Sequence, residues 1–138
     1  MAVEQLRVLV IDDSSLVAEA IRGRLQAAHF EVVVVNSGEE AVAQVSDLKP
    51  DIVTVDANMP GMDGTSAIKL LREQLPTAVI LMLTGRINLK EKMDALRAGA
   101  DDYMVKDPGL PELPARLRLL VEVRRKRSQQ KAAYGIEI

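Results

Sequence analysis

The stretch IVTVDANMPGMDG, residues 52–64, ends an almost wholly apolar run on an acidic residue and then breaks into a turn. The run IVTV is rich in β-branched residues and does not alternate with polar ones, which is typical of a strand buried on both faces. Asp56 closes the run, and Pro60 and two glycines follow. A charge at the end of a buried strand costs free energy unless it has a partner, so Asp56 marks a candidate site.

Short apolar runs of the same kind recur along the chain and alternate with segments of helical spacing. The five runs cover residues 8–11, 32–35, 51–55, 78–83 and 102–105. Apolar residues recur every three or four positions in the segments 17–28, 41–48, 68–75, 89–96 and 110–121. Residues that favour helix starts precede the first four segments: Ser14 or Ser15, Gly38, Asp63 or Thr65, and Asn88.

Strict alternation of five strands with five helices predicts an α/β fold. Right-handed crossovers place the helices on both faces of a doubly wound, five-stranded parallel sheet, with the flavodoxin-like strand order 2-1-3-4-5. We expect one domain over residues 1–123. Residues 124–138 are interpreted as a basic C-terminal helix extension, a tail or a truncated linker. The cluster RRKR at 124–127 can be a solvated helix end, part of a linker helix or a contact for an acidic partner.

Composition excludes several kinds of site. The chain of 138 residues has no cysteine and one histidine, His29, so disulfides, thiolate ligands and imidazole clusters are ruled out. Any metal must therefore be held by oxygen. No apolar run approaches the roughly 18 residues of a membrane span, and the first residues do not resemble a secretory leader. We expect a soluble, cytoplasmic protein, and the net charge of −2 argues against direct nucleic-acid binding.

Polar residues end most of the predicted strands, and they share one edge of the sheet. Asp12 and Asp13 follow the first run, Asp56 the third, Thr84 the fourth and Lys106 the fifth. Ligands of open α/β sheets bind at the carboxyl edge where the strand order reverses, here between the first and third strands. Three carboxylates in one pocket repel one another unless a cation is present. Oxygen donors alone favour Mg²⁺, with Mn²⁺ as a substitute.

The remaining two residues suit an anion beside that metal. Thr84 offers a hydroxyl and Lys106 a mobile positive charge, so a phosphoryl group is the natural ligand. Phosphoryl transfer needs positioning and cancellation of charge more than covalent chemistry by the protein. A carboxylate can itself act as the nucleophile, which would give an aspartyl-phosphate.

These motifs resemble the receiver domain of two-component response regulators from about residue 6 to residue 123. The segments that carry the resemblance are VLVIDD, VDANMPGMDG, LMLTG and ADDYMVK, in that order. The resemblance implies that Asp56 is the phosphoacceptor and that Asp12 and Asp13 hold Mg²⁺ together with Asp56. It also implies that Asn58 adds its backbone carbonyl and that Lys106 contacts the phosphoryl oxygens.

The resemblance further implies a switch and its partners. Thr84 matches the switch hydroxyl of the family and Tyr103 the switch aromatic. The phosphoryl donor would be a sensor histidine kinase or a histidine phosphotransfer protein, and the recipient of the signal a downstream output domain or target protein. A homodimer through the fourth helix, fifth strand and fifth helix is also implied. Such a chain is a signalling phosphoacceptor that catalyses only its own phosphorylation and dephosphorylation.

One feature departs from the family pattern, in which proline directly follows the lysine. Here the chain reads VKDPG, so Asp107 intervenes before Pro108. The Asp107–Pro108 bond can still be cis. We expect an altered loop register, in which Asp107 can pair with Lys106 and weaken its hold on a phosphoryl group.

Two other function classes are open to test. A phosphohydrolase with an aspartate nucleophile typically has a second aspartate two positions later, but that position is Asn58 here. A degenerate receiver that serves only as an interaction module would not need the intact set Asp12, Asp13, Asp56, Thr84 and Lys106. Both classes are therefore disfavoured.

Overall fold

A computed structural model describes residues 4–135 of the chain. The elements are β1 (Arg7–Ile11), α1 (Ser15–Ala27), β2 (Glu31–Val35), α2 (Gly38–Leu48), β3 (Ile52–Asp56), α3 (Gly64–Gln74), β4 (Val79–Thr84), α4 (Leu89–Ala98), β5 (Asp102–Val105), α5 (Lys106–Gly109), the 3₁₀ helix η1 (Leu110–Glu112) and α6 (Leu113–Tyr134). No helix within residues 4–135 combines the length and apolar character needed to cross a bilayer.

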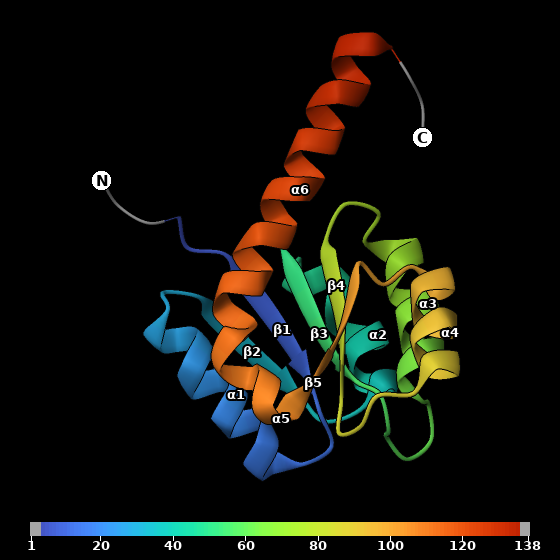
Figure 1. Cartoon of the computed structure of the whole chain (residues 1–138). Helices are drawn as coiled ribbons and strands as arrows, with labels where there is room; N and C mark the ends of the chain where they lie inside the picture. The colour runs from blue at the N-terminus through green and yellow to red at the C-terminus, as the bar shows by residue number, and fades with distance from the viewer. Residues whose placement is uncertain (1–3, 136–138) are drawn as a thin grey trace.

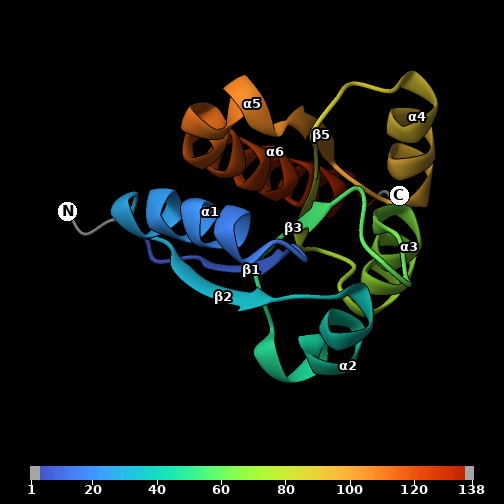
Figure 2. The same cartoon turned by 90° about the horizontal axis from the view of Figure 1, so that it is seen from below.

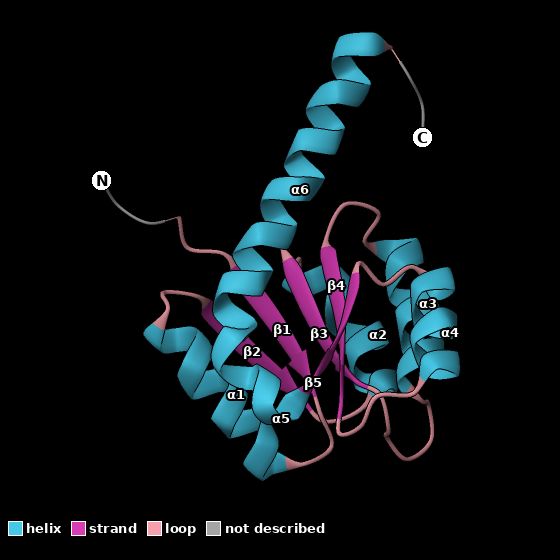
Figure 3. Ribbon diagram, viewed as in Figure 1, coloured by secondary structure: helices cyan, strands magenta, loops and turns pink. Residues whose placement is uncertain are grey.

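The five strands form one parallel sheet in the order β2-β1-β3-β4-β5, which confirms the predicted topology (Figures 1 and 3). β1 is the switch point of the order, with β2 on one side and β3 on the other. In the register, Ile11 lies opposite Val55 of β3 and Val35 of β2. The end of β1 is therefore held next to the end of β3, where the first acidic residues were expected to meet.

Helices cover both faces of the sheet and give the protein two cores (Figure 2). On one face, Val8 and Val10 of β1 belong to the same buried cluster as Ile21 and Leu25 of α1, and this cluster includes Leu113 and other residues of α6. On the other face, residues of β1, β3 and β4 pack with α2, α3 and α4. Burial on both faces explains why the strands read as continuous apolar runs.

Side-chain caps set the helix starts, and they resolve the alternatives that the sequence left open. Ser14, rather than Ser15, accepts from the Val17 N–H at the start of α1. Asp63, rather than Thr65, caps α3, and Asn88 caps α4 as predicted. The α2 cap is Ser37, and Gly38 is the first residue inside that helix. Each such oxygen satisfies an N–H that has no partner within the helix.

The C-terminal part of the domain differs from the expected single fifth helix that starts near residue 110. The four-residue segment α5, in which Asp107 and Pro108 have non-helical backbone angles, and the short η1 come first, and the long helix α6 starts at Leu113. α6 then continues to Tyr134 and passes the expected boundary at residue 123 without a break. It runs from the carboxyl edge of the sheet to a point beyond the amino ends of the strands (Figure 1). The end of the expected tail, 136–138, lies outside the described residues.

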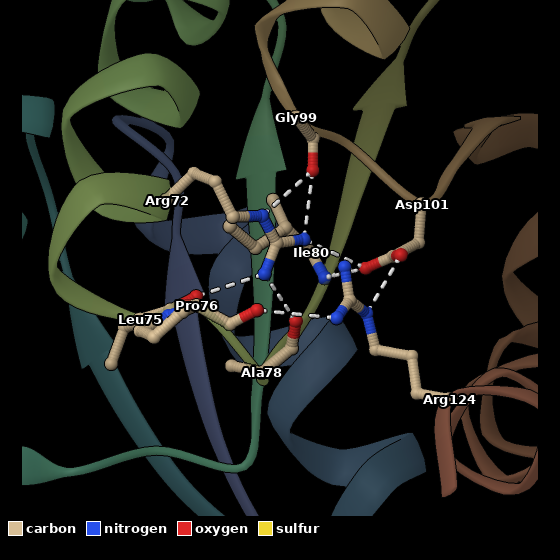
Figure 4. A network of polar contacts seen from close by, with 8 residues as sticks. All are labelled: Arg72, Leu75, Pro76, Ala78, Ile80, Gly99, Asp101 and Arg124. Carbon is tan, nitrogen blue, oxygen red and sulfur yellow. Dashed lines mark hydrogen bonds and ion pairs between the residues drawn. The ribbon is translucent and has the colours of Figure 1, made fainter. Parts of the chain in front are cut away.

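A partly buried network of charges fixes α6 against the amino edge of the sheet (Figure 4). Arg72 of α3 donates to the carbonyl of Gly99, at 2.7 and 3.0 Å, and to Asp101 Oδ2 at 3.0 Å. Asp101 Oδ1 accepts from Arg124 of α6 at 2.8 Å. Gly99 has a φ of +122°, and a Cβ there would lie 2.9 Å from Arg72 Cγ, so a side chain would force the two apart.

The basic cluster at 124–127 is therefore only partly a solvated helix end. Arg124 is bound to Asp101, and Arg125 pairs with Glu4 at 2.7 Å on the surface. Lys126 and Arg127 are exposed. Half of the cluster thus attaches α6 to the body of the domain, which the interpretation as solvated charges missed.

Thr54, in the middle of β3, is expected to weaken the fold. It is 1% exposed, and among the described residues its hydroxyl is the one buried side-chain oxygen or nitrogen without a hydrogen-bond partner. Replacing Thr54 with valine keeps the shape and removes the hydroxyl, so the free energy of unfolding should rise by about 1 kcal/mol. Urea unfolding measures the change, and the exposed Thr77→Val is the control. A Thr54→Val protein that is no more stable than the wild type would show that the hydroxyl is satisfied in solution.

Candidate functional site

The structure places the polar strand ends at the carboxyl edge of the sheet. Asp12 directly follows β1, Asp56 is the last residue of β3, Thr84 is the last residue of β4, and Lys106 follows β5. The Asp12 N–H donates to the Val35 carbonyl at 3.2 Å, so pairing with β2 continues one residue past the end of β1. This extension holds the Asp12 side chain next to the end of β3.

Three carboxylates converge there. One oxygen each from Asp12, Asp13 and Asp56 lies within 4.8 Å of the others. Asp12 and Asp56 are buried and Asp13 is exposed. The Ser14 N–H donates to Asp12 at 2.9 Å, and the Asn58 N–H donates to Asp56 at 3.3 Å, so the local backbone orients both buried groups. An oxygen-only donor set that is open to water on one side fits a hard divalent cation.

Lys106 supplies the positive charge that the described residues bring to this cluster. Its Nζ donates to Asp12 Oδ2 and to Asp56 Oδ1, both at 3.0 Å. Burial, opposed by Lys106 and supported by the charge of Asp12, raises the pKa of Asp56 to about 6. Burial alone would lower the pKa of Lys106, but its bonds to the two carboxylates outweigh that effect and raise it. Lys106 therefore stays charged near neutral pH, where Asp56 is ionised.

Gly64 allows α3 to start directly against the end of β3. A Cβ at this position would lie 2.6 Å from the Asp56 carbonyl oxygen and 3.0 Å from Ala57 Cα. The Gly64 N–H instead donates to the Ala57 carbonyl at 3.2 Å. Because the start of α3 is fixed in this way, the mostly exposed loop from Asn58 to Asp63 both leaves and returns beside the end of β3.

Thr84 and Tyr103 meet at one backbone carbonyl. The Thr84 hydroxyl donates to the Arg86 carbonyl at 2.9 Å, and the Tyr103 hydroxyl lies 3.3 Å from the same oxygen. Tyr103 is 9% exposed, with its ring in the core under the loop from β4 to α4. A cavity of about 510 Å³ opens beside this loop and reaches from Thr84 to Asn58.

The prediction that Asp107 pairs with Lys106 is wrong. Lys106 binds Asp12 and Asp56, and among the described residues Asp107 takes part in no ion pair. Asp107 is exposed in the turn of α5, and its bond to Pro108 is cis, as the sequence allowed. The extra residue therefore leaves the contacts of Lys106 to the carboxylates intact.

Sequence reasoning missed Glu91, which accepts a hydrogen bond from the Tyr103 hydroxyl at 2.8 Å. A signal was present, because Asn88 and Glu91 have the three-residue spacing of a capping box at the start of a helix. The contact with Tyr103 itself has no sequence signal. It joins residues on neighbouring elements of the fold.

Comparison with known proteins gives one consistent family. The model of the response regulator receiver domain matches residues 8–118. The transcriptional regulatory protein PrrA of Mycobacterium tuberculosis is 37% identical over 118 residues, 86% of this chain and 51% of PrrA. A protein-glutamate methylesterase/protein-glutamine glutaminase of Archaeoglobus fulgidus is 43% identical over 106 residues, 75% of this chain and 30% of that protein. The chain thus spans about half, or less, of the length of these relatives.

A solved structure extends the match to the whole of a known domain. The crystal structure of a putative response regulator from Chloroflexus aurantiacus superimposes with a TM-score of 0.81 at 34% identity, over 86% of this chain and 99% of that one. The strand order, the acids at the carboxyl edge and these similarities agree. The chain belongs to the family of response regulator receiver domains.

Proposed function

We propose that the chain accepts a phosphoryl group on the carboxylate of Asp56 from a phosphohistidine of a sensor histidine kinase or a histidine phosphotransfer protein. The observation that carries this proposal is the convergence of three carboxylates within 4.8 Å, with Lys106 Nζ 3.0 Å from Asp56 Oδ1. A purely structural role would not require three acids at one edge of the sheet. A phosphoryl site in which a cation offsets the negative charges does require them.

The chain's own residues supply most of the chemistry. An oxygen of ionised Asp56 attacks phosphorus, the P–N bond breaks, and its electron pair returns to the imidazole nitrogen, which takes up a proton. Asp12, Asp13 and Asp56, with the Asn58 backbone carbonyl, would hold Mg²⁺, for which Mn²⁺ could substitute. When bound, the ion offsets negative charge on the carboxylates and the phosphoryl oxygens. Lys106 shifts its hydrogen bond from Asp56 to a phosphoryl oxygen.

The proposed switch depends on the carbonyl of Arg86, which the hydroxyls of both Thr84 and Tyr103 can reach. A phosphoryl oxygen would draw the Thr84 hydroxyl away from that carbonyl, which then needs another donor. The Tyr103 hydroxyl, 3.3 Å away, can replace it only while the ring stays buried. Phosphorylation therefore favours the buried position of Tyr103 and biases a two-state equilibrium.

The signal would leave through α4, β5 and α6. Large apolar side chains are exposed at the start of α4 and along it, including Ile87, Leu89 and Met93. Such side chains suit a contact surface for an output domain, a target protein or a second copy of the chain. The chain would thus act by binding its partners differently once it is phosphorylated. The only reaction that it catalyses would be its own phosphorylation and dephosphorylation.

The decisive experiment is incubation with acetyl phosphate and Mg²⁺, followed by intact mass measurement. We expect one phosphoryl adduct on the wild type and none on Asp56→Asn. A chelator should also suppress the adduct. Asp47→Asn, an exposed acid on α2, is the control and should be modified like the wild type.

The same experiment separates the other two functions. Continuous release of phosphate at enzyme-like rates, without an accumulated adduct, would indicate a phosphohydrolase. Absence of an adduct with acetyl phosphate and with a phosphorylated histidine donor would indicate an interaction module. Either result would contradict the proposed function.

A further inference from the structure

The hydroxyl of Tyr103 lies inside the cap of α4. Asn88 is the cap residue, and its side-chain oxygen accepts from the Glu91 N–H at 2.9 Å. In a capping box the glutamate side chain would accept from the Asn88 N–H in return. Here the Asn88 N–H donates to the Tyr103 hydroxyl at 3.1 Å, and that hydroxyl donates to Glu91 at 2.8 Å. Tyr103 therefore completes the cap that Glu91 would otherwise close directly.

The single hydroxyl proton of Tyr103 has more than one acceptor within reach. The Glu91 carboxylate at 2.8 Å is nearer than the carbonyl of Arg86 at 3.3 Å, and it is charged. Charge-assisted hydrogen bonds are about twice as strong as neutral ones. The Tyr103 hydroxyl therefore donates to Glu91 as long as the Thr84 hydroxyl donates to the Arg86 carbonyl. Glu91 keeps the hydroxyl in place until Thr84 leaves.

We propose that Glu91 is a positioning residue that holds Tyr103 in its buried orientation and thereby promotes phosphorylation of Asp56. The inference rests on the proposed function, since it assumes that phosphorylation favours buried Tyr103. If the ring turned outward, the Asn88 N–H and, after departure of Thr84, the Arg86 carbonyl would both lose partners. Before phosphorylation, Glu91 raises the fraction of molecules whose ring is buried, and the initial rate of phosphorylation rises with that fraction.

The first measurement tests the contact itself, in a Tyr134→Phe background that leaves Tyr103 as the one tyrosine. Burial raises the pKa of Tyr103, the hydrogen bond from Asn88 opposes this, and Glu91 adds to it. Glu91→Ala should lower the pKa of Tyr103 toward the ordinary value of about 10, as followed by tyrosinate absorbance. An unchanged titration would show that Glu91 does not hold the hydroxyl, which would overturn the inference.

The second measurement is the initial rate of Asp56 phosphorylation by acetyl phosphate and Mg²⁺. Glu91→Ala should lower it about fivefold, the scale of a modest coupling between two sites. Glu91→Gln keeps an acceptor oxygen and should restore most of the rate. Asp94→Ala is the matched control, because it removes one negative charge from α4 and breaks only a surface pair with Lys90.

A double-mutant comparison shows whether Glu91 acts through the tyrosine. In a Tyr103→Phe background, Glu91→Ala should have no further effect on the rate, because the hydroxyl is already absent. An equal fivefold loss in that background would overturn the inference. A wild-type rate for Glu91→Ala would overturn it too, while leaving the proposed function intact. A wild type that takes up no phosphoryl group would instead contradict the proposed function, and the inference would fail with it.

Discussion

Replacing Arg72 with methionine is expected to lower the free energy of unfolding by about 3–5 kcal/mol, although the residue lies far from the candidate site. The side chain is 18% exposed and connects α3 to the segments that lead into β4 and β5. Its guanidinium donates to the carbonyls of Leu75 at 2.9 Å, Ala78 at 2.7 Å and Gly99 at 2.7 and 3.0 Å. Each buried carbonyl that loses its donor costs about 1–3 kcal/mol. Urea unfolding at pH 7 measures the total.

Two controls sharpen this expectation. Arg127→Met on α6 removes an exposed guanidinium, and it should change stability by less than about 0.5 kcal/mol. Arg124→Met should cost less than Arg72→Met, because the Arg124 side chain is more exposed and binds fewer groups. Since both arginines bind Asp101, the double variant should deviate from additivity by at least about 0.5 kcal/mol. Additive effects would mean that the network in Figure 4 does not act as a unit.

The fold was predictable from the sequence because its strands are buried on both faces. Runs such as VVVV at 32–35 carry no alternation, and this excludes a half-exposed antiparallel sheet. A helix extension over residues 124–138 was one of three alternatives, and the sequence did not single it out because residues 124–134 show no apolar periodicity. Their arginines, lysines, glutamines and alanines nevertheless have high helix propensity, and the ion pairs of Arg124 and Arg125 hold the helix to the domain. Propensity would have been the better guide there.

The candidate site was predictable as far as topology decides it. Parallel strands bring Asp12 and Asp56 to one edge wherever the order places β1 beside β3, so sequence position translates directly into proximity. Contacts between side chains of different elements do not follow from topology. The bond from Tyr103 to Glu91 and that from Arg72 to Asp101 depend on rotamers and on how the helices are seated. The supposed pairing of Asp107 with Lys106 failed for the same reason, since Lys106 reaches across the sheet edge instead.

Asp56→Asn is expected to stabilise the metal-free protein by about 2–3 kcal/mol at pH 7.5 while it removes the proposed phosphoacceptor. The pKa of Asp56 is about 6 in the folded protein, against 3.8 for the unperturbed group. Below about pH 4 both folded and unfolded states hold the proton, so the variant and the wild type should be equally stable there. Between pH 4 and 6 the unfolded wild type releases a proton that the folded state retains, and its stability falls as the pH rises.

Urea unfolding in the presence of a chelator, from pH 4 to 7.5, measures this difference, because titrating groups that do not interact with Asp56 contribute equally to both proteins. Asp47→Asn, which removes an exposed carboxylate, should show no such pH dependence. Addition of Mg²⁺ should then raise the stability of the wild type, by about 2.7 kcal/mol at a hundred times its dissociation constant, and raise that of Asp56→Asn less. The stabilisation of the variant comes mainly from relief of the cost of burying the Asp56 charge, with a smaller contribution from repulsion by Asp12, so a cation at the cluster should reduce it. A stability difference that stays constant across this pH range would mean that Asp56 ionises at its ordinary pKa and that burial of its carboxylate carries no cost in solution.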